Sequence, residues 1–145
     1  MTLQPASGAR DLNPQQVRKN HLIASKLSSL YQLWGYERIS PPHIERLDTL
    51  TAAGGISNNE ILKIVSDEPL GLRPEITASI VRAASTRFNE YERPLRFWST
   101  GTSFKCNQSI DGGIDIEESF QSGVELIGTK AVSYTHLTLP TTSMV

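Results

Sequence analysis

The chain has 145 residues, of which 38% are hydrophobic and 20% charged, with a formal net charge of −1. These values are typical of one folded domain, and they exclude a disordered or membrane-spanning chain. The near-neutral charge gives no support to non-specific binding of DNA, which depends on neutralising phosphates. The single cysteine, Cys106, excludes an internal disulfide framework and a multi-cysteine metal site, so no metal and no cofactor is predicted.

Both the start of the chain and its apolar runs favour a cytoplasmic location. Residues 1–10 lack the cationic head and apolar stretch of a signal peptide. No apolar run approaches the ~20 residues that a bilayer requires. We therefore expect a cytoplasmic protein that has no contact with a membrane.

A long helix is predicted over residues 14–34. Asn13 suits the N-cap position and Pro14 suits the first helical position. Apolar residues then recur at three- and four-residue steps, which gives the helix one apolar face, and Gly35 ends the pattern.

Shorter helices and strands follow this helix and alternate along the chain. They are predicted as a strand at 36–40 that stops at Pro41 and Pro42, a short helix at 44–50, hairpin strands at 61–65 and 70–72, a helix at 77–88, and strands at 95–104 and 119–127 around a polar loop at 107–115. Because helices are interleaved with antiparallel-looking strands, we predict an α+β fold built on an antiparallel sheet.

Three segments resemble class II aminoacyl-tRNA synthetases, and in particular the histidine-specific branch. The first segment comprises residues 8–12, the long helix and residues 35–45. It resembles the first signature of that class, which is a helix and a strand ending in proline that form the dimer interface. Residues 71–77 read Gly-Leu-Arg-Pro-Glu-Ile-Thr, similar to the Leu-Arg-Pro-Glu-x-Thr run of the histidyl enzymes. Residues 101–128 occupy the place of the second signature, a strand–loop–strand hairpin.

The resemblance implies a fold and an assembly. The fold would be a class II synthetase-like antiparallel sheet flanked by helices, with residues 1–131 forming the N-terminal part of a catalytic-type domain. The assembly would be a homodimer formed through the first signature, with Pro42 at the interface.

Glu75 supports two interpretations from the sequence. In the first, Pro74 and Glu75 form a helix N-terminus, where a carboxylate satisfies the helix dipole. In the second, Glu75 and Thr77 point acceptors at the ammonium group of a ligand.

Gln121 and Glu125 lie four residues apart on a predicted strand, and therefore on one face, with Gly123 between them. This face is either exposed to solvent or a polar surface with an empty centre that suits a small zwitterion or an imidazole. Histidyl-tRNA synthetases hold histidine at matching positions. The resemblance thus implies that Glu75, Thr77 and Gln121 contact the α-amino end of histidine and that Glu125 binds its imidazole.

The second signature departs from the class at the positions that bind ATP. Synthetases carry Phe-Arg-x-Glu there, whereas this chain has Phe-Lys-Cys-Asn at residues 104–107. Lys105 keeps the positive charge but lacks the planar fork that binds phosphate, and Asn107 lacks the carboxylate. Residues 117–120, Glu-Glu-Ser-Phe, are acidic where synthetases have a basic residue. We predict a degenerate ATP site and no catalytic residue.

A histidine site without an ATP site is typical of the regulatory subunits of ATP phosphoribosyltransferase, the first enzyme of histidine biosynthesis. Residues 3–11, 41–48 and 67–75 are similar to the cyanobacterial form. The resemblance implies a non-catalytic partner that the short-form catalytic subunit needs for activity, with L-histidine as effector. Two alternatives stay open: an N-terminal fragment of a true histidyl-tRNA synthetase (a histidine–tRNA ligase), and a synthetase-like histidine- or tRNA-binding module of a larger sensor protein.

The end of the chain does not resemble the family. Residues 132–141 match what one reading frame of a transposase-based sequencing adapter encodes, so we expect residues 132–145 to be a non-native tail. The alternative is a genuine C-terminal strand. If the tail is foreign, the second histidine-binding motif of the family lies beyond residue 131, and the chain alone is not expected to bind histidine tightly.

Overall fold

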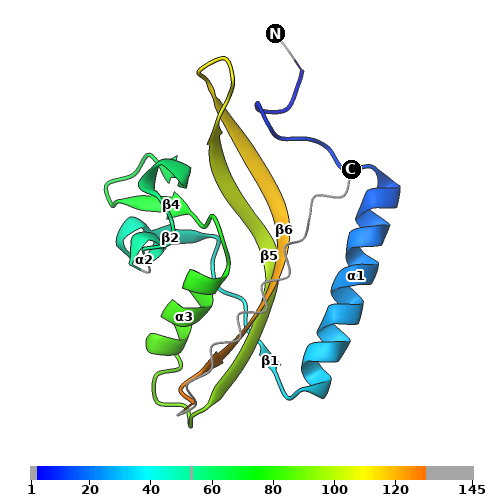
Figure 1. Ribbon diagram of the computed structural model, residues 1–145, viewed down its shortest axis with the longest axis vertical. Coiled ribbons are helices and arrows are strands. Elements are labelled where there is room, and N and C mark those ends of the chain that lie inside the picture. The colour runs from blue at the N-terminus through cyan, green and yellow to red at the C-terminus, as the bar shows by residue number, and fades with distance from the viewer. Residues whose placement is uncertain (1–2, 53, 130–145) are drawn as a thin grey trace.

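The fold was analysed in a computed structural model that describes residues 3–52 and 54–129 (Figure 1). The predicted foreign tail, residues 132–145, lies outside the described residues. In chain order the elements are α1 (Pro14–Leu33), β1 (Glu37–Arg38), β2 (Ile44–Arg46), α2 (Leu47–Thr51), a 3-10 turn η1 (Asn58–Glu60), β3 (Lys63–Ile64), β4 (Leu70–Leu72), α3 (Thr77–Ser85), β5 (Leu95–Gln108) and β6 (Ile114–Ile127).

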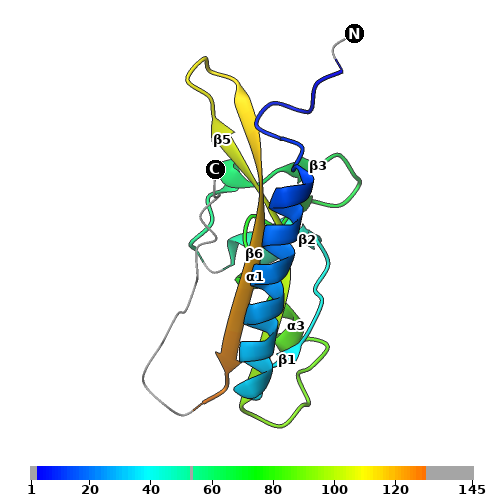
Figure 2. The same cartoon turned by 90° about the vertical axis from the view of Figure 1, so that its right-hand side faces the viewer.

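A central sheet in the order β1-β5-β6 separates two layers, and a small sheet in the order β2-β4-β3 lies beside it. Figure 1 shows α1 along one face of the β5–β6 hairpin, with α3, α2 and the small sheet on the other face. Figure 2, turned by 90°, shows α1 in front of β6 along most of that strand. The hairpin is therefore covered by helices on both faces at its root, whereas its tip extends beyond them.

The predicted helix over residues 14–34 is confirmed as α1. Asn13 caps it in a capping box, because its side chain accepts from the Gln16 backbone N–H at 2.9 Å and the Gln16 side chain accepts from the Asn13 N–H at 2.9 Å. Tyr31 is the buried residue of α1. Its ring lies 5.3 Å from that of Trp98, and its hydroxyl accepts from Ser122 Oγ at 3.1 Å, so it fastens α1 to the hairpin.

The β5–β6 hairpin is longer than predicted. The strands pair antiparallel from Leu95 opposite Ile127 to Gln108 opposite Ile114. The expected loop at 107–115 was therefore too long, because its polar residues complete the ladder instead of leaving it. On the other edge β5 pairs with β1 in parallel, so the sheet is not purely antiparallel.

Two shorter predictions need correction. The helix expected at 44–50 begins only at Leu47, because Ile44 starts β2 and pairs antiparallel with Leu72 of β4. Pairing with another strand has overridden the local helical preference. The helix expected at 77–88 ends at Ser85. The hairpin predicted at 61–65 and 70–72 is confirmed as β3 and β4.

The core lies between α3 and the root of the hairpin. Its main cluster contains the buried residues Ile76, Ile80, Ala84, Leu95 and Phe97, against which Ile39, Phe88 and Ile127 pack. Within residues 3–52 and 54–129, no helix combines the length and apolar character needed to cross a membrane.

The N-terminal segment crosses the outer half of β6. Ile116 N–H donates to the Ser7 carbonyl at 2.9 Å, and Ser7 Oγ donates to Asp115. Gly8 has φ +83, and a Cβ there would lie 2.5 Å from the Ile116 carbonyl oxygen. Only glycine fits this contact, which explains structurally why the motif at residues 8–12 begins with glycine.

Candidate functional site

The four residues predicted to bind histidine gather at the start of α3 and on the strand beneath it. Gln121 and Glu125 lie on the α3-facing side of β6, two residues before and two residues after Gly123. A Cβ on Gly123 would lie 2.8 Å from Ile76 Cγ2. Since Glu75 and Thr77 directly flank Ile76, all four predicted residues surround one contact between helix and strand.

The centre of this polar face is filled by a side chain. Ile76 packs on Gly123 and is itself buried. The expectation of an empty centre between Gln121 and Glu125 is therefore wrong, because the side chain of Ile76, the residue just before α3, occupies the space over Gly123. A small polar ligand at these residues would bind beside Ile76 rather than on Gly123.

The Glu75 carboxylate caps α3. Oε2 accepts from the Thr77 N–H at 3.0 Å, and Oε1 accepts from the Ala78 N–H at 2.9 Å. The helix N-terminus interpretation is confirmed for Glu75, whose negative charge also suits the positive end of the helix dipole. It is wrong for Pro74, which lies three residues before the first residue of α3. A carboxylate has about four lone-pair positions and uses two here. The second interpretation, contact with an ammonium group, therefore stays a prediction compatible with the cap.

Arg73 is a component of the site that sequence reasoning left without a role. Its side chain is buried, and its guanidinium donates to the carbonyl oxygens of Thr102 at 3.0 Å, Pro41 at 3.1 Å and Pro42 at 3.4 Å. Burial lowers the pKa of Arg73 from its usual value, and the negative charge of Glu45 partly opposes that shift. The sequence contains one indication of this role, because Arg73 lies in the Leu-Arg-Pro-Glu run.

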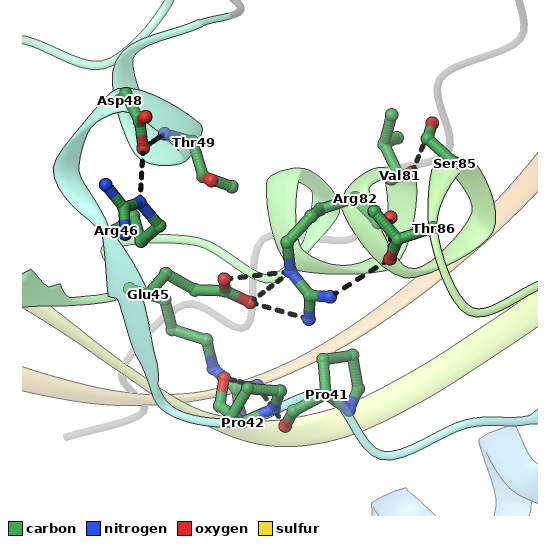
Figure 3. Close-up of polar contacts among 11 residues, drawn as sticks. Pro41, Pro42, Glu45, Arg46, Asp48, Thr49, Val81, Arg82, Ser85 and Thr86 are labelled. Carbon is green, nitrogen blue, oxygen red and sulfur yellow. Dashed lines mark hydrogen bonds and ion pairs between the residues drawn. The ribbon is translucent and has the colours of Figure 1, made fainter.

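An ion pair lies on the side of α3 that faces β2 and the proline pair (Figure 3). The Glu45 carboxylate is buried and binds Arg82, with Nε 2.8 Å from Oε2. A cleft of about 450 Å³ opens beside this pair, with Pro41 and Pro42 in its wall. The pair joins β2 of the small sheet to α3.

Lys105 and Asn107, the positions predicted to be a degenerate ATP site, line a second cavity of about 270 Å³ on the outer half of the hairpin. Lys105 stands opposite Glu117 in the ladder. Asn107 Nδ2 donates to Glu117 Oε2 at 3.0 Å, and Ser119 Oγ donates to Glu117 Oε1 at 3.0 Å. The cavity is thus lined by two carboxylates, Glu60 and Glu117, and one lysine, and the excess negative charge would repel a polyphosphate. Gln121 also lines it, so this cavity adjoins the predicted histidine site.

The structure does not bring a metal-binding cluster together in the part of the chain it describes, since no three His, Cys, Asp or Glu side chains there are placed to hold a metal ion. Cys106 lies on β5, partly exposed, as a free thiol. Its register partner is Ile116, so it faces away from Lys105 and Asn107.

Comparison with known proteins places the chain in a family. The profile described as histidyl-tRNA synthetase matches residues 8–137, and the chain belongs to this family.

The curated relatives carry a more specific name. The ATP phosphoribosyltransferase regulatory subunit of Prochlorococcus marinus strain NATL1A is 98% identical over 133 residues, which cover 92% of this chain and 34% of the relative. The protein of the same name from Prochlorococcus marinus strain SARG is 64% identical over 128 residues, covering 88% of this chain and 33% of the relative. The resemblance to these regulatory subunits is confirmed. The chain spans about a third of their length.

A solved structure shows the same fold. The crystal structure of an ATP phosphoribosyltransferase regulatory subunit/histidyl-tRNA synthetase from Bacillus halodurans aligns with a TM-score of 0.77 at 27% identity, covering 90% of this chain and 34% of that one. The predicted α+β, histidyl-tRNA synthetase-like fold is therefore confirmed.

Proposed function

We propose that the complete protein to which this sequence belongs is a non-catalytic regulatory subunit of ATP phosphoribosyltransferase. It would act in the cytoplasm, where the short-form catalytic subunit would require it for activity and histidine would exert feedback inhibition through it. The observation that carries the proposal is the identity of 98% and 64% to two proteins named as such regulatory subunits.

Histidine would bind beside the first turn of α3. Glu75, Thr77 and Gln121 would accept from or contact the α-amino group, and Glu125 would bind the imidazole. The close approach of α3 to β6 at Gly123 supports this proposal, because it keeps the helix residues and the strand residues within one small region. A site that pairs each polar group of its ligand strongly rejects analogues that lack one.

The subunit would not activate histidine with ATP. The carboxylate of Glu117, held by Asn107 and Ser119, supports this part of the proposal, because it places a negative charge near the position of the arginine that synthetases use for the α-phosphate. Lys105 offers a single point charge in place of a bidentate fork. Such a site suits an effector rather than a substrate.

The subunit would also form a homodimer through the first signature, with Pro42 at the interface. An apolar surface on α1 and just after it supports this assembly. A second copy would cover the exposed side chains of this surface: Leu22, Leu30, Leu33 and Trp34. Trp34 is 67% exposed, whereas Trp98 is buried against Tyr31. The first tryptophan therefore suits the dimer face and the second belongs to the core.

The test uses the full-length protein, meaning a chain of the relatives' length that carries these residues. ATP phosphoribosyltransferase activity would be measured for the short-form catalytic subunit alone, with the full-length protein, and with added histidine. We expect activity only in the mixture, and histidine should inhibit it. Exchange of pyrophosphate into ATP would be measured in parallel. Histidine-dependent exchange would contradict the proposal and favour a true histidyl-tRNA synthetase.

A further inference from the structure

Arg73 joins two segments that are far apart in the sequence. Its side chain is 2% exposed. Nε donates to the carbonyl of Thr102 on β5 at 3.0 Å, and Nη1 donates to the carbonyls of Pro41 at 3.1 Å and Pro42 at 3.4 Å. These bonds are charge-assisted and lie away from water, where such bonds are strong.

The backbone of Arg73 bridges the same two segments. Its N–H donates to the His43 carbonyl at 2.9 Å, and its carbonyl accepts from the Phe104 N–H at 2.9 Å. The proline turn and β5 are thus held to one residue by five hydrogen bonds, from both its side chain and its main chain. If either segment moved away, a buried cation would lose an acceptor, so the two segments are expected to move together.

A glycine on β5 makes room for this guanidinium. A Cβ on Gly101 would lie 2.3 Å from Arg73 Nη2. Gly101 stands opposite Gln121 in the β5–β6 ladder, and Arg73 precedes Glu75 by two residues. The guanidinium therefore lies between the proline turn and β5, and β5 is the strand that pairs with the Gln121 position of β6.

We propose that Arg73 is the positioning residue through which the histidine site and the Pro41–Pro42 turn are coupled. The inference rests on the proposed function, because it takes Glu75 and Gln121 as parts of the effector site and Pro42 as part of the subunit interface. A ligand that shifts the start of α3 moves Arg73 with it, and β5 and the proline turn move together because both are bonded to Arg73. The turn at the subunit interface follows, and the histidine signal reaches the partner subunits by this route.

The test compares Arg73→Lys with Arg82→Lys in the full-length protein. Lysine keeps the charge of Arg73 but cannot reach acceptors on both segments with a rigid fork. Arg82 is the matched control, because it is also an arginine with a buried partner, but its side chain bonds to Glu45 and Thr86 instead of bridging the proline turn and β5. For each variant, the histidine Kd would be measured on the free subunit and on its complex with the short-form catalytic subunit, together with the thermal midpoint.

The ratio of the two histidine Kd values measures coupling, which for allosteric proteins is typically about 5- to 150-fold. We expect a ratio in this range for the unmodified protein and for Arg82→Lys, and a ratio near 1 for Arg73→Lys. A merely structural role would lower the thermal midpoint of Arg73→Lys and leave its ratio unchanged, which would overturn the inference. A ratio of 1 in the unmodified protein would also overturn it, since there would be no coupling to carry.

A second variant keeps the test decisive if Arg73→Lys fails to fold. Gly101→Ala leaves Arg73 in the chain but pushes its guanidinium from the carbonyl partners, and the same fall in the ratio is expected. An unchanged ratio in a folded Gly101→Ala protein would contradict the inference. Failure of the proposed function gives a different result: the unmodified full-length protein would then bind no histidine at all.

Discussion

The root and the tip of the β5–β6 hairpin are made from the same two strands but have different surroundings. At the root, α1 covers one face through Tyr31 and Trp98, and α3 covers the other so closely that Gly123 has no room for a side chain. Toward the tip, the α3-facing side carries polar and charged residues that bond mainly to one another, as Asn107 does to Glu117. Residues near the turn are exposed, including Ile114.

The two halves of the hairpin therefore differ in how much stability a substitution costs. Substitution at the root changes close-packed contacts and is costly, whereas substitution toward the tip exchanges one exposed polar group for another. The contact of Ile76 with Gly123, which the predicted histidine residues surround, lies at the root, whereas Lys105 and Asn107, the predicted degenerate ATP positions, lie on the outer half. Under the proposed function, substitutions at Lys105 and Asn107 would leave the packing of Ile76 on Gly123 intact.

The largest difference between root and tip is expected for isoleucine truncation. Ile80 has no exposed surface, and Ile80→Ala should lower the free energy of unfolding by about 2–5 kcal/mol, because it leaves a cavity in the core. Ile114 is 66% exposed, so Ile114→Ala should change it by less than about 0.5 kcal/mol. Urea unfolding of both variants measures the difference. Equal losses would mean that the tip is packed as tightly as the root.

Glycine substitution gives a smaller effect in the same direction. In Gly123→Ala the new methyl group would lie 2.8 Å from Ile76 Cγ2, and the overpacking should cost about 1–3 kcal/mol of unfolding free energy. Gly113 near the tip is the matched control, because its nearest neighbour, Ser109 Cβ, lies at 4.0 Å. Urea unfolding should find Gly113→Ala close to the unmodified chain. A neutral Gly123→Ala would show that α3 can move away from the strand.

The sequence predicted those features that local chemistry decides. Asn13 and Pro14 marked the start of α1, and the period of two placed Gln121 and Glu125 on one face. In each case the residues that specify the feature are neighbours in the chain, so a short window of sequence contains the whole signal.

The features that were missed depend on residues far apart in the sequence. The start of β2 depends on Leu72, and the packing of Ile76 on Gly123 joins residues 47 positions apart. The carbonyl partners of Arg73 lie 29 to 32 positions away. The polar outer half of the hairpin resembled a loop because strand pairing, rather than apolar alternation, holds it extended. Only a three-dimensional structure supplies such contacts.

Substitution of Glu75 separates its role as the cap of α3 from its proposed role in binding histidine. Glu75→Gln keeps one oxygen for the α3 amides but loses the charge, so we expect a loss of about 0.5–2 kcal/mol in unfolding free energy. In the full-length protein, the affinity for histidine should also fall about tenfold or more, because a charge-assisted contact to the ammonium group is lost.

Asn13→Ala is the control for this experiment. It removes the cap of α1 at a similar cost of about 1 kcal/mol, with none of the predicted histidine residues nearby in the chain. Calorimetric titration should give an unchanged affinity for histidine. If Glu75→Gln also kept its affinity, Glu75 would be a helix cap alone, and the proposed site would lose its main acceptor.

The smallest effect on stability is expected on the outer half, at Glu117. An amide oxygen can still accept from Asn107 or Ser119, so Glu117→Gln should change the unfolding free energy by less than about 0.5 kcal/mol. Removing the negative charge from the cavity should strengthen the binding of ATP to the full-length protein by on the order of 1 kcal/mol, about fivefold. Fluorescence titration with a labelled ATP analogue would measure this gain.

Glu118→Gln separates the local effect from the change in net charge. It removes the same charge, but Glu118 stands opposite Phe104 on the other face of the strand, away from Lys105 and the cavity. If the fixed carboxylate of Glu117 is what excludes a polyphosphate, Glu117→Gln should gain affinity and Glu118→Gln should not. Equal gains would mean that net charge alone keeps ATP away, and the outer half of the hairpin would then contain no specific barrier to the nucleotide.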